Sequence, residues 1–160
     1  MIHETESPPT ITGLPPSGSV HDEREIEAVL EVMRTTNLSI GAKVAEFEQR
    51  VAGLLAKDRG VMVNSGSSAL RLAIDLLDCQ PGDEIITSPL TFSTDIAPMV
   101  QSGIIPSFVD VETGTFQIDP ARIEEMVGPR TKAILAPNLV GNCPDWDAIR
   151  TIADQHGLLV

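Results

Sequence analysis

The sequence is poor in aromatic side chains and in basic charge. Phenylalanine, tryptophan and tyrosine make up 3% of the 160 residues, and tyrosine is absent. A core must therefore be built from aliphatic side chains, which the hydrophobic fraction of 42% supplies. Eleven lysines and arginines stand against 23 aspartates and glutamates, so the net charge is -12 at pH 7. This balance argues against nucleic acid or an anionic membrane as a partner, because both require a basic surface.

Other absences exclude several kinds of site. The two cysteines, Cys79 and Cys143, are far apart, which argues against a metal site or a disulfide framework and favours free thiols in a reducing cytosol. The N-terminus lacks the features of a signal peptide, and no apolar run is long enough to span a membrane. We therefore expect a cytoplasmic protein. Neither Gly-x-Gly-x-x-Gly, nor a P-loop, nor a Gly-x-Ser-x-Gly elbow occurs, which disfavours dinucleotide binding and triad hydrolysis.

The first third of the chain predicts an arm and two helices. Residues 1–20 are rich in proline, serine, threonine and glycine, so we expect an extended arm without a core of its own. Apolar residues at helical spacing predict a helix from Asp22 to about Arg34 and a second one between Val44 and Leu55. These helices would pack outside a sheet or against another subunit.

From Gly60 onward, strand and helix patterns alternate. The predicted strands are Gly60–Asn64, Glu84–Ser88, Ile104–Asp110, Lys132–Pro137 and Leu158–Val160. The predicted helices are Ser67–Leu77, Thr91–Gln101, Pro120–Val127 and Asp145–His156. This order predicts an α/β fold with a doubly wound, mostly parallel sheet and right-handed crossovers. The helix after the first strand is apolar nearly all round, so we expect it to be deeply buried.

A short run of small residues, Asn64–Ala69, joins the first predicted strand to its helix. Such a turn leaves the first amides of the helix without internal partners, and these amides with the helix dipole form an anion site. The hydroxyls of Ser67 and Ser68 can add donors, and Gly66 leaves the backbone accessible to a phosphate. The alternative is that Ser67 or Ser68 merely caps the helix.

Two further loops follow predicted strands, where parallel sheets place their ligands. The loop Ser88–Phe92 carries Phe92, which either stacks on a flat ring or packs in the core. The loop Asn138–Asn142 carries Asn138, which either bonds a ligand or serves as a turn residue before Gly141-Asn142.

Several stretches taken together resemble one family. In chain order they are Leu38–Gly41, Val44–Glu48, Asn64–Leu70, Pro81–Thr87, Thr91–Phe92, Pro106–Val111, Ile118–Pro120, Pro129–Ile134 and Gly141–Asn142. This ordered set resembles the DegT/DnrJ family of pyridoxal-phosphate sugar aminotransferases, which have the type I aminotransferase fold. The resemblance covers the chain from about residue 20 to its end, so residues 21–160 would be the N-terminal part of the cofactor-binding large domain.

The resemblance implies a cofactor and residues that hold it. The phosphate of pyridoxal 5'-phosphate would lie at Gly66, Ser67 and Ser68, and Phe92 would stack on the pyridine ring. Asn138 stands where many relatives carry histidine at the cofactor's edge. The reaction implied is transfer of an amino group from an amino acid, typically glutamate, to a keto sugar on a nucleotide, with the cofactor as electron sink.

The resemblance also implies partners and a place for one further loop. The family's sites lie at subunit interfaces, so a homodimer is expected for the full-length protein. Leu38–Gly41 matches a loop near the substrate side of the site. The product would serve amino-sugar or cell-surface polysaccharide biosynthesis.

The chain departs from the family at its catalytic groups. The family's Schiff-base lysine and the aspartate that pairs with the pyridine nitrogen would both follow Val160, and Lys43, Lys57 and Lys132 do not match the lysine motif. We therefore expect an N-terminal fragment that has no catalytic residue of its own, is inactive and aggregates when alone.

Two alternatives stay open. Some relatives carry histidine in place of the lysine and remove a 3-hydroxyl from a 4-keto sugar, and the stretch Pro137–Trp146 is similar to that dehydratase branch. The other alternative is a non-catalytic binding or regulatory module that retains the fold.

Overall fold

A computed structural model describes residues 18–35 and 39–160. The expected arm, residues 1–20, lies outside this part of the chain except for its last three residues. The chain divides into two compact units, one ending at Gly60 and the other running from Val61 to Val160. Each unit is described by itself.

The first unit contains the two predicted helices, α1 (Glu23–Met33) and α2 (Ala42–Leu54). Asp22 caps α1 by accepting a hydrogen bond from the Arg24 amide, and the Asp22 amide donates to the Glu25 carboxylate, which completes a capping box. Within the described residues, α1 buries no side chain and α2 buries only Ala52. The apolar faces of both helices are therefore left largely exposed inside this unit.

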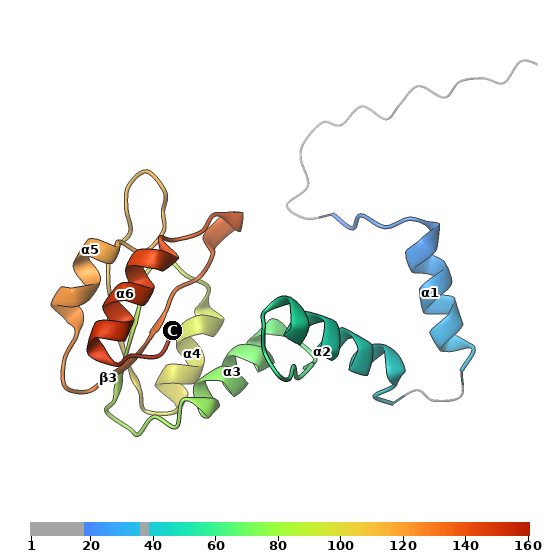
Figure 1. The fold of residues 1–160 in the computed structure, drawn as a ribbon, viewed down its shortest axis with the longest axis horizontal. Coiled ribbons are helices and arrows are strands. Elements are labelled where there is room, and N and C mark those ends of the chain that lie inside the picture. Colours follow the sequence, from blue (N-terminus) through green and yellow to red (C-terminus); the bar gives the residue numbers. More distant parts are fainter. Residues whose placement is uncertain (1–17, 36–38) are drawn as a thin grey trace, which may run out of the picture. The chain divides into compact units, whose positions relative to one another are not determined.

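The second unit is built on a parallel sheet (Figure 1). Its strands are β1 (Glu84–Thr87), β2 (Ile105–Phe108) and β3 (Thr131–Leu135), in the order β2-β1-β3. Both β2 and β3 pair with β1 in parallel. The predicted parallel sheet is confirmed, with shorter strands than the apolar runs suggested.

Two of the predicted strands are not formed as such. Gly60–Asn64 was expected as a strand, but this prediction is wrong: the segment enters no ladder with any described residue. A strand needs a neighbour for its backbone N–H and C=O groups, and an apolar run alone does not provide one. Leu158–Val160 forms a single parallel bridge, between Leu159 and Ala133.

The predicted helices of the second unit are present with shifted ends. They are α3 (Gly66–Leu76), α4 (Ser93–Gln101), α5 (Pro120–Ile123), which continues as the 3-10 turn η1 (Glu124–Met126), and α6 (Trp146–His156). A further 3-10 turn, η2 (Leu139–Gly141), follows β3. Asp119 and Asp145 cap α5 and α6 through their side chains, as their positions before each helix predict.

The sheet separates two apolar clusters. Ile86 and Ile134 point to one face and pack with Ile123 of α5 and Ile149 of α6. Ile85 and Ala133 point to the other face and pack with Ile74 of α3 and Met99 of α4. Helices therefore cover both faces of the sheet (Figure 1), and the predicted doubly wound arrangement is confirmed.

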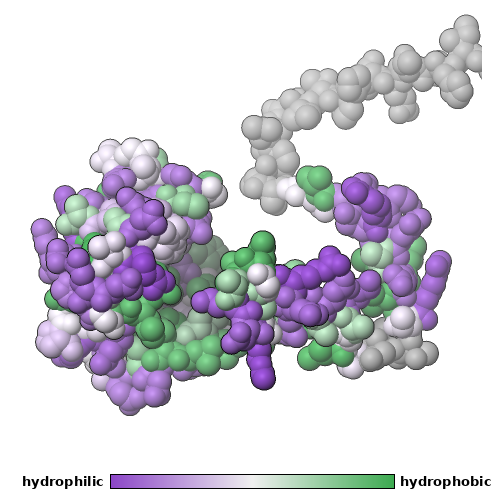
Figure 2. All heavy atoms as spheres, viewed as in Figure 1, coloured by the Kyte–Doolittle hydropathy of each residue, from purple (hydrophilic) through white to green (hydrophobic). Residues whose placement is uncertain are grey.

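The predicted deep burial of the helix after the opening turn is wrong. Within the described residues, Ile74 is the one buried residue of α3. Leu76 is 76% exposed, and Figure 2 shows hydrophobic residues gathered on the surface of the second unit around α3 and α4. A helix that is apolar all round needs covering elements on several sides, and within this unit α3 packs mainly on α4 and one face of the sheet.

Candidate functional site

The carboxyl edge of the sheet brings two of the predicted loops together. The loop after β1 carries Phe92 and the loop after β3 carries Asn138, and β1 and β3 are hydrogen-bonded neighbours. Parallel strands end at the same edge, so both loops lie at that edge. α3 precedes β1 and packs on α4, which follows β1. No hydrogen bond between described residues joins the N-terminus of α3 to either loop.

The turn before α3 is held by three side chains. Ser65 is the N-cap, and its hydroxyl oxygen accepts from the Ser68 amide at 3.2 Å. The Ser65 hydroxyl donates to the Ser68 hydroxyl oxygen at 3.1 Å, and Ser68 donates to the Asn64 Oδ1 atom at 2.6 Å. The suggestion that Ser67 or Ser68 caps the helix is therefore wrong, because the cap belongs to Ser65, which has the extended backbone that a cap requires.

This capping leaves a specific set of donors open. The amides of Gly66 and Ser67 and the Ser67 hydroxyl have no partner among the described residues. A Cβ atom added at Gly66 would meet nothing within 4 Å, so the backbone there is open to a ligand. Open amides at the positive end of a helix fit a phosphate group.

Arg71 adds a positive charge one turn further along α3. A hollow on this helix is lined by Ser67, Ser68, Arg71, Leu72 and Asp75. The Arg71 guanidinium pairs with Asp75 at 3.0 Å and also donates to Gln101 of α4 at 3.3 Å. Because Asp75 pairs with Arg71, the open helix amides are the better candidates for binding an anion.

Phe92 occupies the N-cap position of α4 and its side chain is 71% exposed. The suggestion that this ring packs in the core is therefore wrong, and the ring is available to a flat ligand. The residues on either side are fixed: Thr91 donates a hydrogen bond to the buried carboxylate of Asp95, and the Asp95 amide donates to the Phe92 carbonyl at 2.9 Å. The sequence pattern did not single out Asp95, although it is the one charged residue of α4, which was a signal.

Asn138 is exposed and stands directly before η2, so its place in a turn is confirmed, and its exposed side chain is also open to a ligand. Its Oδ1 atom accepts from the indole nitrogen of Trp146 at 3.0 Å. The neighbouring loop residue Leu139 is bonded on both backbone groups by Gln117, a side chain that is 3% exposed. Gln117 and Trp146 were not predicted as site residues; the signal for Trp146 was that it is the chain's single tryptophan.

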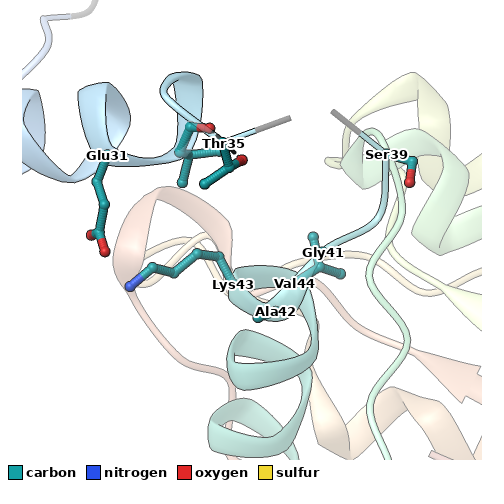
Figure 3. Close-up of a pocket in the computed structure, with 8 residues that line it drawn as sticks. Glu31, Thr35, Ser39, Gly41, Ala42, Lys43 and Val44 are labelled. Atoms are coloured by element: carbon teal, nitrogen blue, oxygen red, sulfur yellow. Dashed lines mark hydrogen bonds between the residues drawn. The ribbon is translucent and has the colours of Figure 1, made fainter. Parts of the chain in front are cut away.

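The first unit holds a separate hollow between the end of α1 and the start of α2 (Figure 3). Ser39 and Gly41 line it, and both belong to the loop Leu38–Gly41 for which the resemblance implied a place near substrate; Leu38 itself lies outside the described residues. The hollow also contains Glu31 and Lys43, which form no ion pair with each other. Its two charges of opposite sign give it no preference for an anion.

Several other kinds of site find no support in the described part of the chain. No group of His, Cys, Asp and Glu side chains there could hold a metal ion. No helix among residues 18–35 and 39–160 is long and apolar enough to cross a membrane. Burial, and next the nearby Asp83 carboxylate, raise the pKa of the Cys79 thiol, so this thiol is not an activated nucleophile.

Comparison with known proteins gives consistent matches. The curated relatives include the spore coat polysaccharide biosynthesis protein SpsC of Bacillus subtilis, 41% identical over 147 residues, which are 92% of this chain and 38% of SpsC. They also include the dTDP-4-dehydro-2,6-dideoxy-D-glucose 3-dehydratase of Saccharopolyspora spinosa, 38% identical over 98% of this chain and 36% of that protein. The chain thus spans little more than a third of the length of these relatives.

A solved structure shows the same fold. The crystal structure of a GDP-4-keto-6-deoxymannose-3-dehydratase with a trapped PLP-glutamate geminal diamine superposes with a TM-score of 0.86 at 33% identity, over 92% of this chain and 40% of that one. The sequence profile of the DegT/DnrJ/EryC1/StrS aminotransferase family matches residues 19–160. The chain therefore belongs to the DegT/DnrJ/EryC1/StrS aminotransferase family.

Proposed function

We propose that this chain contributes the phosphate-binding part of a pyridoxal-phosphate enzyme that transfers an amino group from an amino acid, typically glutamate, to a keto sugar nucleotide. The observation that carries the proposal is the N-terminus of α3, where the Gly66 and Ser67 amides are open and a Cβ atom at Gly66 would meet nothing. Family membership supplies the cofactor that such a site would hold.

Each residue of the site has a distinct part in this proposal. The amides of Gly66 and Ser67 and the Ser67 hydroxyl bind the phosphate. Ser68 can donate to a phosphate only by giving up its bond to Asn64, so its contribution is smaller. Phe92 offers an exposed ring to stack on the pyridine, and Asn138 bonds at the cofactor's edge.

The chemistry of the reaction comes mainly from outside these residues. When bound, pyridoxal phosphate supplies the electron sink for amino transfer. This chain's residues bind and orient it, and we assign no proton transfer to any of them. The complete protein would work as a homodimer, in the biosynthesis of amino sugars or cell-surface polysaccharide.

The experiment is a titration of the complete protein with pyridoxal phosphate, followed by equilibrium dialysis. We expect Ser67→Ala to weaken binding by roughly 10- to 100-fold, since a hydrogen bond to a charged group is lost, and Ser68→Ala to weaken it less. The control is Ser102→Ala, at the C-terminal end of α4 and away from Phe92, and it should bind pyridoxal phosphate like the wild type. Pyridoxal without its phosphate should bind wild type and Ser67→Ala equally. If a Ser67→Ala, Ser68→Ala double variant bound pyridoxal phosphate as tightly as the wild type, the phosphate would not lie at the N-terminus of α3.

A second candidate is a nucleotide-sugar 3-dehydratase. It is favoured by the 3-dehydratase relative, which matches 98% of this chain, and by the 3-dehydratase structure. Incubation of the complete protein with a 4-keto sugar nucleotide and glutamate separates the two: an amino sugar supports transamination, and loss of the 3-hydroxyl supports dehydration. Cofactor binding without either product would instead support a non-catalytic module.

A further inference from the structure

The side-chain amide of Asn138 has a defined orientation. An asparagine amide carries an oxygen that accepts and a nitrogen that donates, whereas the indole nitrogen of tryptophan only donates. The Trp146 Nε1 atom lies 3.0 Å from the Asn138 amide, so the atom facing it must be the oxygen. Chemistry therefore assigns the orientation of the Asn138 amide.

This orientation leaves one group of the amide free. The Nδ2 atom of Asn138 has no partner among the described residues, and the side chain is exposed. With its oxygen engaged by Trp146, Asn138 can offer a ligand two N–H donors. A ligand atom at this position must consequently be an acceptor.

The backbone that carries Asn138 is held from a second side. The Gln117 Oε1 atom accepts from the Leu139 amide at 3.2 Å, and its Nε2 atom donates to the Leu139 carbonyl, also at 3.2 Å. The Asn142 side chain donates to the Thr115 carbonyl at 3.4 Å. Because Gln117 is buried and bonds both groups of Leu139, it acts as a clamp on the loop rather than as a surface contact.

We propose that Trp146 and Gln117 are positioning residues that make Asn138 a hydrogen-bond donor, so that the site accepts an oxygen or nitrogen lone pair at this edge and rejects a donor. The inference rests on the proposed function, because it takes the ligand to be pyridoxal phosphate or the substrate bound beside it. Neither positioning residue needs to touch the ligand. They determine which end of the Asn138 side-chain amide faces the ligand and where that amide lies.

The test is a double-variant cycle on the complete protein, with the affinity for pyridoxal phosphate measured by equilibrium dialysis. Trp146→Phe keeps the aromatic ring and removes the donor, and we expect about threefold to tenfold weaker binding. In an Asn138→Ala background the same Trp146→Phe change should have no further effect, because Trp146 acts through Asn138. A purely structural role of Trp146 would weaken binding equally in both backgrounds, and that result would overturn the inference.

Asn138→Asp gives a test that leaves Trp146 in place. The carboxylate still accepts from the indole, so Trp146 keeps its hydrogen bond. The ligand would meet an acceptor where it needs a donor, and we expect at least about tenfold weaker cofactor binding. Gln117→Met, which keeps length but cannot bond Leu139, should weaken binding and shift the tryptophan emission. The matched Gln80→Met, in the turn before β1, should change neither.

The outcomes separate this inference from the proposed function. If the wild type fails to bind pyridoxal phosphate, the proposed function and this inference are both overturned. If wild type binds and the Ser67→Ala, Ser68→Ala variant does not, while Asn138→Asp and Trp146→Phe bind like wild type, the proposed function stands and this inference is overturned.

Discussion

Thr91 donates a hydrogen bond to the Oδ2 atom of Asp95, a carboxylate that is 7% exposed in the first turn of α4. Phe92 lies between these two residues in the chain, and its carbonyl accepts a hydrogen bond from the Asp95 amide. A carboxylate near the N-terminus of a helix is stabilised by the helix dipole. The pair thereby holds the first turn of α4, at which the exposed Phe92 stands.

Removal of the Thr91 hydroxyl should destabilise the protein, although Thr91→Val barely changes the size of the side chain. Thr91→Val leaves a buried carboxylate without its side-chain partner, and we expect a loss of about 1–3 kcal/mol in the free energy of unfolding. Thr91→Ser keeps the hydroxyl and should lose little. Urea denaturation of the complete protein measures both variants, and equal stability of Thr91→Val and Thr91→Ser would contradict this role for the pair.

Substitutions at Ser65 should separate helix capping from phosphate binding. Ser65→Ala removes the cap of α3 and should cost about 1 kcal/mol of unfolding free energy. Ser65→Asp restores a capping oxygen, so stability should return, but its charge beside the open amides should repel a phosphate and weaken cofactor binding. Denaturation and cofactor titration of the same variants give the comparison. A Ser65→Asp variant that binds pyridoxal phosphate as tightly as wild type would place the phosphate elsewhere.

The capping of α1 should depend on pH. Hydrogen bonds from the Arg24 side chain, and next from its backbone amide, lower the pKa of Asp22 to about 2 from its ordinary 3.8. A carboxyl with a lowered pKa stabilises the folded state above its unfolded pKa, and this stabilisation disappears as the pH falls from about 4 to about 2.

The matched variant for this test is Asp22→Asn, which caps comparably but does not titrate. We expect helix content from far-ultraviolet circular dichroism to fall more steeply between pH 4 and pH 2 in wild type than in Asp22→Asn. Parallel acid curves for the two proteins would show that Asp22 contributes nothing to helix stability.

Val140 should be replaceable with a gain in stability. Its φ of 55° lies in the left-handed region, which is unfavourable for a β-branched residue, and its side chain is 94% exposed. Val140→Asn or Val140→Gly should relieve this strain and raise the free energy of unfolding by about 1 kcal/mol, with no packing lost. Val140→Pro, whose ring fixes φ near -65°, should destabilise the loop. Thermal unfolding measures the effect. If Val140→Asn and Val140→Gly both lowered the melting temperature, the backbone strain at Val140 would be contradicted.

Local chemistry made most helices predictable. Asp119 before Pro120 and Asp145 before Trp146 mark helix starts because a carboxylate satisfies open amides within a few residues, and the structure has both caps. Strands β1 and β3 were predictable because each carries a short apolar run, Ile85-Ile86 and Ala133–Leu135, that lies between helices on both faces of the sheet. The run Gly60–Asn64 also has an apolar centre, yet it forms no strand in the described chain, since pairing depends on a neighbour that composition does not specify.

Periodicity, capping and small-residue turns act over a few positions, so the alternation of strands and helices, the doubly wound sheet and the glycine and serines of the α3 turn could all be predicted from the sequence. Only the folded chain shows that the Phe92 ring is exposed and that Gln117 and Trp146 hold the Asn138 loop. Those outcomes depend on contacts between segments far apart in sequence: Gln117 and Leu139 are 22 positions apart. A hydrogen bond over such a separation forms only once the sheet has brought its two loops to the same edge.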